Sequence, residues 1–265
     1  MPVNIIVCVK QVMDPETPVS AFRINSSKTG VEPAPGIPPV VNGFDENAVE
    51  AALRIKEAVG GTITVLSVGS SFAMDVMKKP LSMGADQMFL VQDPAAAGLD
   101  AAATANALVA AIKKIGEFDI VLCGRQASDW DQSQVPYGVA EMLDLPVVSV
   151  ARKIEVVDGG IVAQKTLTDG YEVVEAPLPV LVTVSNELGE PRYPTLRGIM
   201  AASRKRPTVW SLGDVGIDAD ALAPKVELTE LYIPVSDSSC EFVEGEDGAD
   251  AGRKLALRLR EARLI

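Results

Sequence analysis

Histidine is absent from the 265 residues of this chain. Its absence excludes Ser-His-Asp and Cys-His nucleophile pairs, histidine general bases and histidine-ligated metal sites. Any catalysis would therefore rest on carboxylates, lysine, tyrosine or a bound cofactor.

Cysteine is scarce, since the chain has only Cys8, Cys123 and Cys240. No two of them form a CxxC pair, and Cys8 and Cys123 lie inside apolar runs. We expect small core residues in a reducing compartment rather than a disulfide framework or a metal site.

Positive charge is also in short supply, with 24 Lys and Arg against 36 Asp and Glu and a net charge of -12. This balance disfavours nucleic acid and anionic membranes as partners. No apolar run reaches the roughly 18 residues of a membrane span. The first residues lack the basic and apolar regions of a signal peptide, so we expect a cytoplasmic protein.

Aromatic residues make up only 5% of a chain that is 48% hydrophobic, so the core is expected to consist of Val, Ile, Leu and Ala. Strands are predicted at 4–9, 62–68, 87–91, 118–123 and 147–150. Helices are predicted from 45 to about 60, at 71–83 with Pro80 kinking or shortening it, at 101–115 and at 134–143. This alternation predicts an α/β fold with a doubly wound, mostly parallel sheet of the Rossmann-like or adenine-nucleotide alpha-hydrolase-like kind.

The pattern changes after Val150. Turns at 158–160 and 169–170 predict hairpins that add an antiparallel edge to the sheet. Residues 11–43 read as loop with a small hairpin around 27–30, and a late strand is predicted at 226–234. A basic helix is predicted at 251–264; it is either a solvated face or an arm that packs on a partner subunit.

In doubly wound sheets, ligands bind beyond the carboxyl ends of the parallel strands. The candidate ends follow Val9, Val68, Val91 and Cys123, and the helix start at 42–45 approaches the same edge. The stretch GRQASDWDQSQVPYG from residue 124 is unusually polar for a strand end. Three interpretations remain open: a pocket for an adenine nucleotide, a capped turn without a ligand, and catalysis by paired carboxylates.

The nucleotide interpretation rests on backbone groups. Gly124 allows close approach of the main chain, and a helix starting near 132–134 offers free N–H groups to a phosphate. Asp129 and Asp131 would repel a phosphate, so we expect them to cap N–H groups or point to water. Neither GxGxxG nor GxxxxGK[ST] occurs.

A second notable stretch runs from Asn186 to Met200. Its two prolines prevent regular structure before Thr195, which can cap a short helix. Leu196, Ile199 and Met200 then form one apolar stripe. The stripe either docks a partner or folds back on the protein's own core.

The chain resembles the beta subunits of electron transfer flavoproteins over essentially its whole length. The motifs that carry the resemblance are Val9-Lys10-Gln11-Val12, Asn42-Gly43-Phe44-Asp45-Glu46-Asn47-Ala48, Met83-Gly84-Ala85-Asp86, Gly124-Arg125-Gln126-Ala127 and, above all, Asn186 to Met200.

The resemblance implies a heterodimer with an electron transfer flavoprotein alpha subunit that holds most of the FAD. It also implies a buried, structural AMP in this chain. The residues implied for that site are Cys8, Val9, Asn42, Gly43, Phe44, Asp45, Val68, Gly124, Arg125, Gln126, Ala127, Ser128, Asp129, Asp131, Gln132, Ser133, Gln134 and Val135.

Two further sites follow from the same resemblance. Residues 186–206 match a recognition loop in which Leu196 anchors on an acyl-CoA-type or other flavin dehydrogenase. Tyr193, Arg192, Ile199 and Met200 surround that anchor. Glu172 lies where the family places an acidic residue that steadies the flavin domain. Residues 1–235 would form the α/β nucleotide-binding domain, and 236–265 an arm on the alpha subunit.

The nucleotide itself has two candidates. Some anaerobic members hold a second FAD instead of AMP and bifurcate electrons from NADH; they show D-G-D-T-A-Q-V-G-P where this chain has Asp129-Trp130-Asp131-Gln132-Ser133-Gln134-Val135-Pro136-Tyr137. Gln134 and Val135 agree with that pattern, whereas Trp130, Gln132 and Pro136 do not. AMP-type members show N-Q-T, which is matched only at Gln134. AMP is favoured.

Three functions therefore stand against each other. The favoured one is an electron-carrier subunit without catalytic residues, active in acyl-CoA or fatty-acid oxidation and passing electrons to an acceptor such as a quinone oxidoreductase. The second is an NADH-oxidising bifurcating subunit. The third, a nucleotide sensor of the universal-stress type, should lack the 186–200 excursion.

Overall fold

The computed structural model describes residues 1–235 and 239–265. Its contacts divide the chain into two units, Met1–Leu231 and Tyr232–Ile265. The expected start of the arm at residue 236 falls on residues outside the described ranges.

The first unit contains a nine-stranded sheet in the order β11-β10-β9-β12-β8-β1-β6-β7-β13. All neighbours from β9 to β13 in this order pair in parallel, whereas β9, β10 and β11 pair antiparallel. The predicted class, a mostly parallel α/β sheet with an antiparallel hairpin edge, is confirmed. The strands are β1 (Val3–Cys8), β6 (Gly61–Gly69), β7 (Gln87–Gln92), β8 (Ile120–Gly124), β9 (Val147–Val157), β10 (Gly160–Leu167), β11 (Gly170–Pro177), β12 (Val180–Val184) and β13 (Thr208–Trp210).

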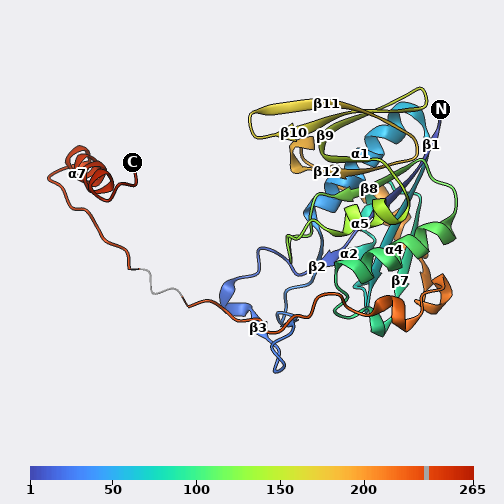
Figure 1. The fold of residues 1–265 in the computed structure, drawn as a ribbon, viewed down its shortest axis with the longest axis horizontal. Helices are drawn as coiled ribbons and strands as arrows, with labels where there is room; N and C mark the ends of the chain where they lie inside the picture. The colour runs from blue at the N-terminus through green and yellow to red at the C-terminus, as the bar shows by residue number, and fades with distance from the viewer. Residues whose placement is uncertain (236–238) are drawn as a thin grey trace. The chain divides into compact units, whose positions relative to one another are not determined.

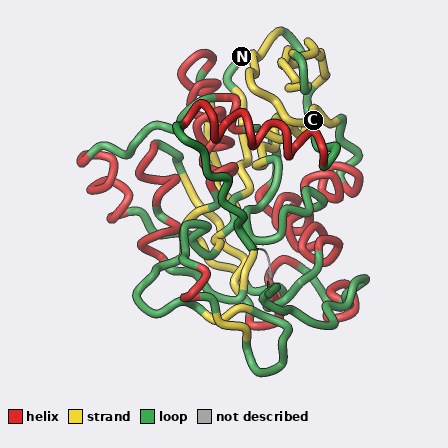
Figure 2. Tube along the Cα trace, turned by 90° about the vertical axis from the view of Figure 1, so that its left-hand side faces the viewer, coloured by secondary structure: helices red, strands yellow, loops and turns green. Residues whose placement is uncertain are grey.

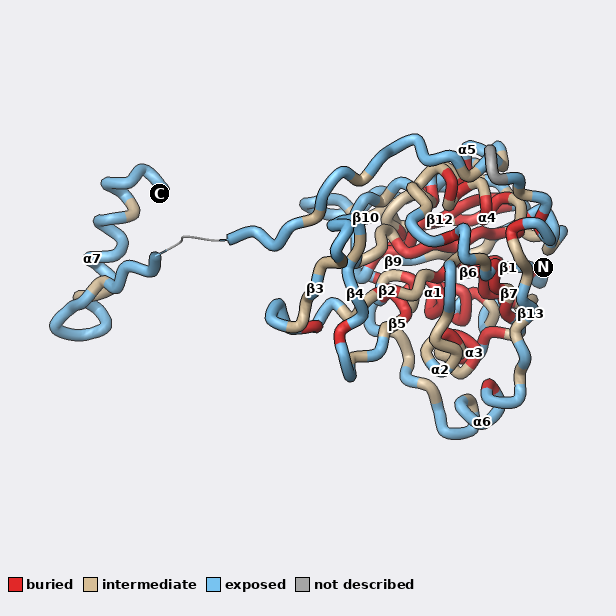
Figure 3. The backbone as a smooth tube through the Cα atoms, turned by 90° about the horizontal axis from the view of Figure 1, so that it is seen from below, coloured by how far each residue is buried: buried red, intermediate tan, exposed pale blue. Residues whose placement is uncertain are grey.

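Helices cover both faces of this sheet, because alternate residues of each strand point to opposite sides. In β1, Ile5 and Val7 pack in a core with helix α1, whereas Ile6 and Cys8 pack in a second core with α4 and α5. Figure 3 shows the buried strands between these helices. The α-helices of the unit are α1 (Gly43–Val59), α2 (Met74–Met77), α3 (Lys79–Met83), α4 (Ala101–Ile115), α5 (Val135–Met142) and α6 (Leu196–Arg204), and the 3-10 helices are η1 (Val19–Ala21), η2 (Pro94–Ala96), η3 (Asn186–Leu188), η4 (Gly213–Val215) and η5 (Ala219–Leu222).

Local signals set several helix ends. The Asp100 side chain accepts a hydrogen bond from Ala103 N at 2.8 Å and starts α4, while Gly116, at φ 106°, ends it. The predicted helix 71–83 is divided into α2 and α3, with Pro80 in the first turn of α3. A proline is tolerated there because the first N–H groups of a helix have no partner in the helix.

The long segment after β1 is mostly irregular, as the green trace in Figure 2 indicates. It carries two small antiparallel pairs, β2 (Gln11–Val12) with β5 (Val40–Val41) and β3 (Arg23–Ile24) with β4 (Val31–Glu32). The second pair confirms the hairpin predicted around 27–30. Figure 1 shows how these elements and the sheet follow one another along the chain.

Three strand predictions need correction. β9 continues to Val157, because its later residues pair with β10 after it leaves β12. β13 was missed, since three residues after Pro207 are too short a pattern to stand out. Residues 226–234 do not form a strand, and there Asp100 accepts from Val226 N at 3.1 Å while Leu231 N donates to Lys28 O at 2.7 Å.

The second unit holds helix α7 (Gly248–Glu261), started by Asp247, whose side chain accepts from Asp250 N. No residue of α7 is buried within the unit. Its apolar side chains, including Leu255 and Leu257, are exposed. In the described ranges, no helix is long and apolar enough to cross a membrane.

Candidate functional site

The carboxyl ends of β1, β6, β8 and β12 lie next to one another. Cys8 is in register with Leu66 on one side and Cys123 on the other, and Thr183 is in register with Cys123. The chain proceeds from β1 to β6 and β7 in one direction and from β8 to β12 in the other. The order of strands therefore reverses between β1 and β8, where ligands of doubly wound sheets bind.

Asp45, in the first turn of α1, ties this helix to both central strands. Its Oδ1 accepts from Gly124 N at 3.0 Å, and its Oδ2 accepts from Lys10 N at 2.7 Å. Burial raises the pKa of Asp45 from its ordinary 3.8 to about 7, against the opposing effect of hydrogen bonds from Lys10 N, the Asn42 side chain and Gly124 N. One carboxyl group thus binds the last residue of β8 and Lys10, which follows β1.

Asn42, just before α1, makes the second connection. Its Nδ2 donates to Gln126 O at 2.8 Å, and its Oδ1 accepts from Ser128 N at 3.2 Å. The residue is fully buried. A buried amide that is satisfied at both ends holds the main chain after β8 in one conformation.

The switch-point segment, residues 124–135, uses its own carboxylates. Asp129 forms an ion pair with Lys10 Nζ at 2.7 Å, and Asp131 Oδ1 accepts from Gln126 Nε2 at 2.6 Å. Trp130 N and Asp131 N both donate to Ala127 O. Each aspartate is therefore bound by another side chain, Asp129 by Lys10 and Asp131 by Gln126. This arrangement argues against the paired-carboxylate catalysis that the sequence left open.

Donors without partners gather in the same segment. Among the described residues, Arg125 Nε and Ser128 Oγ are buried and lack hydrogen-bond partners. The Arg125 guanidinium lies 4.8 Å from the ring centre of Phe44. Helix α5 begins after Gln134 without a side-chain cap. Its second residue, Pro136, has no N–H, so the Val135 N–H is the group of this start that faces an anion bound at the segment.

The remaining residues predicted for the nucleotide site lie near the ends of β1 and β6 and near the starts of α1 and α5. Cys8 and Val9 are buried, and Val9 N donates to Leu66 O at 2.9 Å. Val68 is the second-last residue of β6 and packs against the core, and Gly43 is exposed at the start of α1. Ser133 has a φ of 55° and stands in the sequence between Gln132 and Gln134, whose side chains are exposed; Val135 follows Gln134. Together with the residues above, these positions lie along one edge of the sheet.

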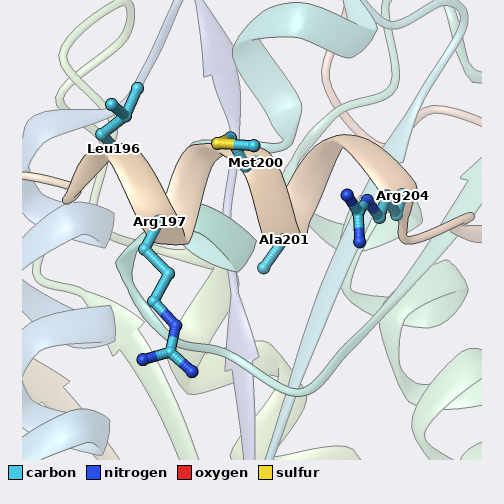
Figure 4. A pocket seen from close by; sticks show the side chains of 5 residues that line it. All are labelled: Leu196, Arg197, Met200, Ala201 and Arg204. Carbon is cyan, nitrogen blue, oxygen red and sulfur yellow. The ribbon is translucent and has the colours of Figure 1, made fainter.

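A second surface lies on α6. Thr195 Oγ1 accepts from Gly198 N at 3.0 Å, which confirms the predicted cap. The exposed fractions are 74% for Leu196, 51% for Ile199 and 54% for Met200. Figure 4 shows Leu196 and Met200 one turn apart along a surface hollow that Arg197, Ala201 and Arg204 also line. In this chain the stripe does not fold back on the core.

Small residues seat α6 on the unit. Ala202 is its one buried residue, and a Cβ on Gly198 would lie 2.3 Å from Ser82 O of α3. Lys205 Nζ donates to Ala85 O and Asp86 O at 2.7 and 2.9 Å. The helix is held by its inner side while its large apolar side chains face outward.

The two other predicted docking residues differ from each other. Tyr193 is 92% exposed. Arg192 instead donates to Glu50 and Glu57 of α1. Sequence reasoning missed Glu50 altogether. Its one local signal is the spacing of Glu50 and Arg54, which places them on one face of a helix.

Glu172 lies on β11 and is 3.3 Å from Lys165 Nζ. Strands β10, β9 and β12 separate β11 from β8 in the sheet. The structure therefore does not bring Glu172 to the switch point.

Comparisons with known proteins found a matching family model and several relatives. A model of the electron transfer flavoprotein domain matches residues 36–215. The chain is 41% identical, over 99% of its length and all of the relative, to an electron transfer flavoprotein subunit beta of Thermoanaerobacterium thermosaccharolyticum. It is 43% identical to the subunit beta of Megasphaera elsdenii over 76% of each chain. It is 36% identical, over 99% of its length and all of the relative, to subunit CarD of a caffeyl-CoA reductase-Etf complex of Acetobacterium woodii.

Proposed function

The chain belongs to the electron transfer flavoprotein family as a beta subunit, and on that premise we propose that it is the nucleotide-holding, dehydrogenase-docking half of a cytoplasmic heterodimer. Its partner is an alpha subunit that holds most of the FAD. The FAD supplies the electron transfer from an acyl-CoA-type or other flavin dehydrogenase to an acceptor such as a quinone oxidoreductase. This chain binds AMP and contributes no catalytic residue.

The observation that carries the AMP proposal is the set of unpartnered donors at the switch point. Arg125 Nε, Ser128 Oγ and the N–H of Val135 at the start of α5 all belong to the switch-point segment. A buried donor without a partner costs about 1–3 kcal/mol, so a ligand that accepts from it is favoured. A phosphate-bearing nucleotide provides such acceptors, and Asn42 and Asp45 hold the surrounding backbone in place.

The test is to release ligands from the purified heterodimer in acid and to count FAD and AMP. We expect one of each. Arg125→Met should lower the AMP content, because methionine fills the space without donating. Arg152→Met is the matched control, since Arg152 also lies over an aromatic ring, that of Tyr171 at 5.6 Å, but on β9. Equal AMP content in both variants would contradict the assignment.

A second FAD in place of AMP, with oxidation of NADH, is the alternative. The exposure of Trp130 favours it, because a side chain that is 49% exposed does not fill the site. One relative also belongs to a reductase complex. Two FAD and no AMP in the acid extract would establish this alternative, as would reduction of the heterodimer by NADH.

Docking is proposed for the outward stripe of α6, with Leu196 as its anchor. Burying a leucine side chain contributes about 1.5–3 kcal/mol. We therefore expect Leu196→Ala to raise the KM for the dehydrogenase by about 10- to 100-fold while the nucleotide content stays unchanged. Val19→Ala is the control, because Val19 is equally exposed at 74%. An unchanged KM in Leu196→Ala would remove the docking assignment.

A further inference from the structure

Glu50 is a buried carboxylate in the middle of α1, with 4% of its surface exposed. Oε1 accepts from Arg54 Nε at 2.8 Å and from Arg192 Nη2 at 3.2 Å. Oε2 accepts from Arg192 Nε at 2.8 Å and from Arg192 N at 3.2 Å. Buried glutamates are rare unless they are paired, and this one is bound by both the side chain and the backbone of Arg192.

Three more residues of α1 bind the segment 188–192, to which Arg192 belongs. Asn47 Nδ2 donates to Gly189 O at 2.9 Å, and Arg54 Nη1 donates to Leu188 O at 3.0 Å. Glu57 Oε2 accepts from Arg192 Nη2 at 3.1 Å. The four α1 positions recur every three or four residues, so they form one stripe of the helix. Every bond from this stripe to the segment ends between residues 188 and 192.

The charges of this stripe are matched. Burial alone would raise the pKa of Glu50, but the hydrogen bonds from Arg192 and Arg54 outweigh it, and the pKa is lowered. The hydrogen bond from Arg192 lowers the pKa of Glu57 as well, and both glutamates raise the pKa of Arg192. All three groups therefore stay charged at neutral pH.

The held segment leads directly into the exposed helix. Only Tyr193 and Pro194 separate Arg192 from the cap at Thr195. The middle of α6 packs closely on α3, where a Cβ on Gly198 would lie 2.3 Å from Ser82 O, but the helix buries only Ala202. Its start is fixed through Arg192, and its end is fixed by the bonds of Lys205 to Ala85 and Asp86.

We propose that Glu50 and Arg192 form a clamp that positions α6 for docking, so that Arg192 acts on the partner through the helix rather than by touching it. This inference rests on the proposed docking function and adds to it a buried residue of α1. The clamp fixes the angle at which the Leu196 stripe leaves the unit. A helix that could reorient would make the same contacts with the partner, but it would bind more weakly, because its orientation would have to be fixed on binding.

The experiment compares Glu50→Gln, Arg192→Met and the double variant in the intact heterodimer. Glu155→Gln is the control, since Glu155 also forms an ion pair, here with Lys153 Nζ at 2.9 Å, but on β9. The rate of amide hydrogen exchange in peptides covering 186–204 shows how firmly α1 fixes this part of the chain. KM and kcat with the dehydrogenase report on docking, and the nucleotide content shows whether the switch point is intact.

Both single variants should speed exchange in 186–204 and raise KM about five- to tenfold, with kcat and nucleotide content within about twofold of the parent. The double variant should resemble the singles, because both remove the same interaction. Arg192→Lys should fall between the parent and Arg192→Met, since lysine keeps the charge but not the planar fork.

A rise in KM for Arg192→Met without one for Glu50→Gln would overturn the clamp, because Glu50 is buried and a direct contact of Arg192 would then explain the result. Unchanged exchange in both variants would also overturn it. The proposed docking function fails separately, through an unchanged KM in Leu196→Ala. In that case faster exchange in Glu50→Gln would still support the hold over 186–204, and unchanged exchange would refute it.

Discussion

Gly124, the last residue of β8, has no room for a side chain. A Cβ at this position would lie 2.4 Å from Asp45 Oδ1, 2.6 Å from the carbonyl carbon of Phe44 and 2.8 Å from Asp45 N. Two of these neighbours are backbone atoms of α1, and the third accepts from Gly124 N at 3.0 Å. Gly124→Ala would therefore push α1 away from β8 at the switch point.

The size of the effect follows from two contributions. Overpacking a well-packed interior costs about 1–3 kcal/mol. Loss of the hydrogen bond to the carboxyl group of Asp45 costs about 1.5–3 kcal/mol. The sum is about 2.5–6 kcal/mol. In a unit of this size, Met1–Leu231, each kcal/mol lowers Tm by about 2–4 °C, so a fall of about 5–24 °C is expected.

Calorimetry of the heterodimer measures this change, and the acid extract measures the nucleotide. Gly170→Ala is the matched control, since nothing lies within 4 Å of a Cβ at Gly170 in the same unit. Gly124→Ala should lower both Tm and nucleotide content. A Tm no lower than that of Gly170→Ala would refute the packing argument. Unchanged nucleotide content would show that the contact of Gly124 with α1 is not needed for ligand binding.

Three further predictions concern single side chains. The folded chain keeps a proton on Asp45 up to a pKa of about 7, against 3.8 when unfolded, so the group's contribution to stability falls by up to about 4 kcal/mol as pH rises from about 4 to 7 and is constant above. Asp45→Asn should remove this dependence of the unfolding free energy on pH, measured by urea unfolding at pH 5, 6, 7 and 8. The same dependence on pH in the parent and the variant would contradict the prediction. Thr195→Ala should cost about 1 kcal/mol and speed exchange in α6, whereas Thr195→Asp should keep the cap; equal exchange in the two variants would argue against capping. The hydrogen bond with Cys8, together with burial, raises the pKa of Cys123. Cys8 and Cys123 are both buried whereas Cys240 is exposed, so Cys123 and Cys8 should react with a disulfide reagent only after denaturation; rapid labelling of more than one thiol in the native protein would disprove it.

Where local chemistry decides, the sequence predicted the fold closely. Helix α4 occupies the predicted residues 101–115, because Asp100 caps its start and Gly116 ends it. The strand β13 was missed and the strand expected at 226–234 does not form, since pairing with a distant strand or bonding to a distant side chain decides the state of both segments. Val226 N, for example, donates to an aspartate 126 positions away.

The candidate site divides in the same manner. The polar strand ends after β1 and β8 pointed to one edge of the sheet, because parallel strands bring their carboxyl ends together. The bonds that shape this edge join residues such as Asn42 and Ser128, which are 86 positions apart. No spacing rule relates such residues, since their distance depends on which strands are neighbours.

The sequence by itself determined which side-chain chemistry is absent from this protein and which local elements it forms. It excluded histidine chemistry, predicted the alternating strands and helices, and identified the Thr195 cap, because each depends on composition or on residues within a few positions. Only the tertiary structure decided how the charges are used. The carboxylates of the switch-point segment are bound by Lys10 and Gln126, and Arg192 is bound by a buried glutamate of α1. An ionic side chain can pair or bind a ligand, and which it does depends on the partner that the fold brings within about 3 Å.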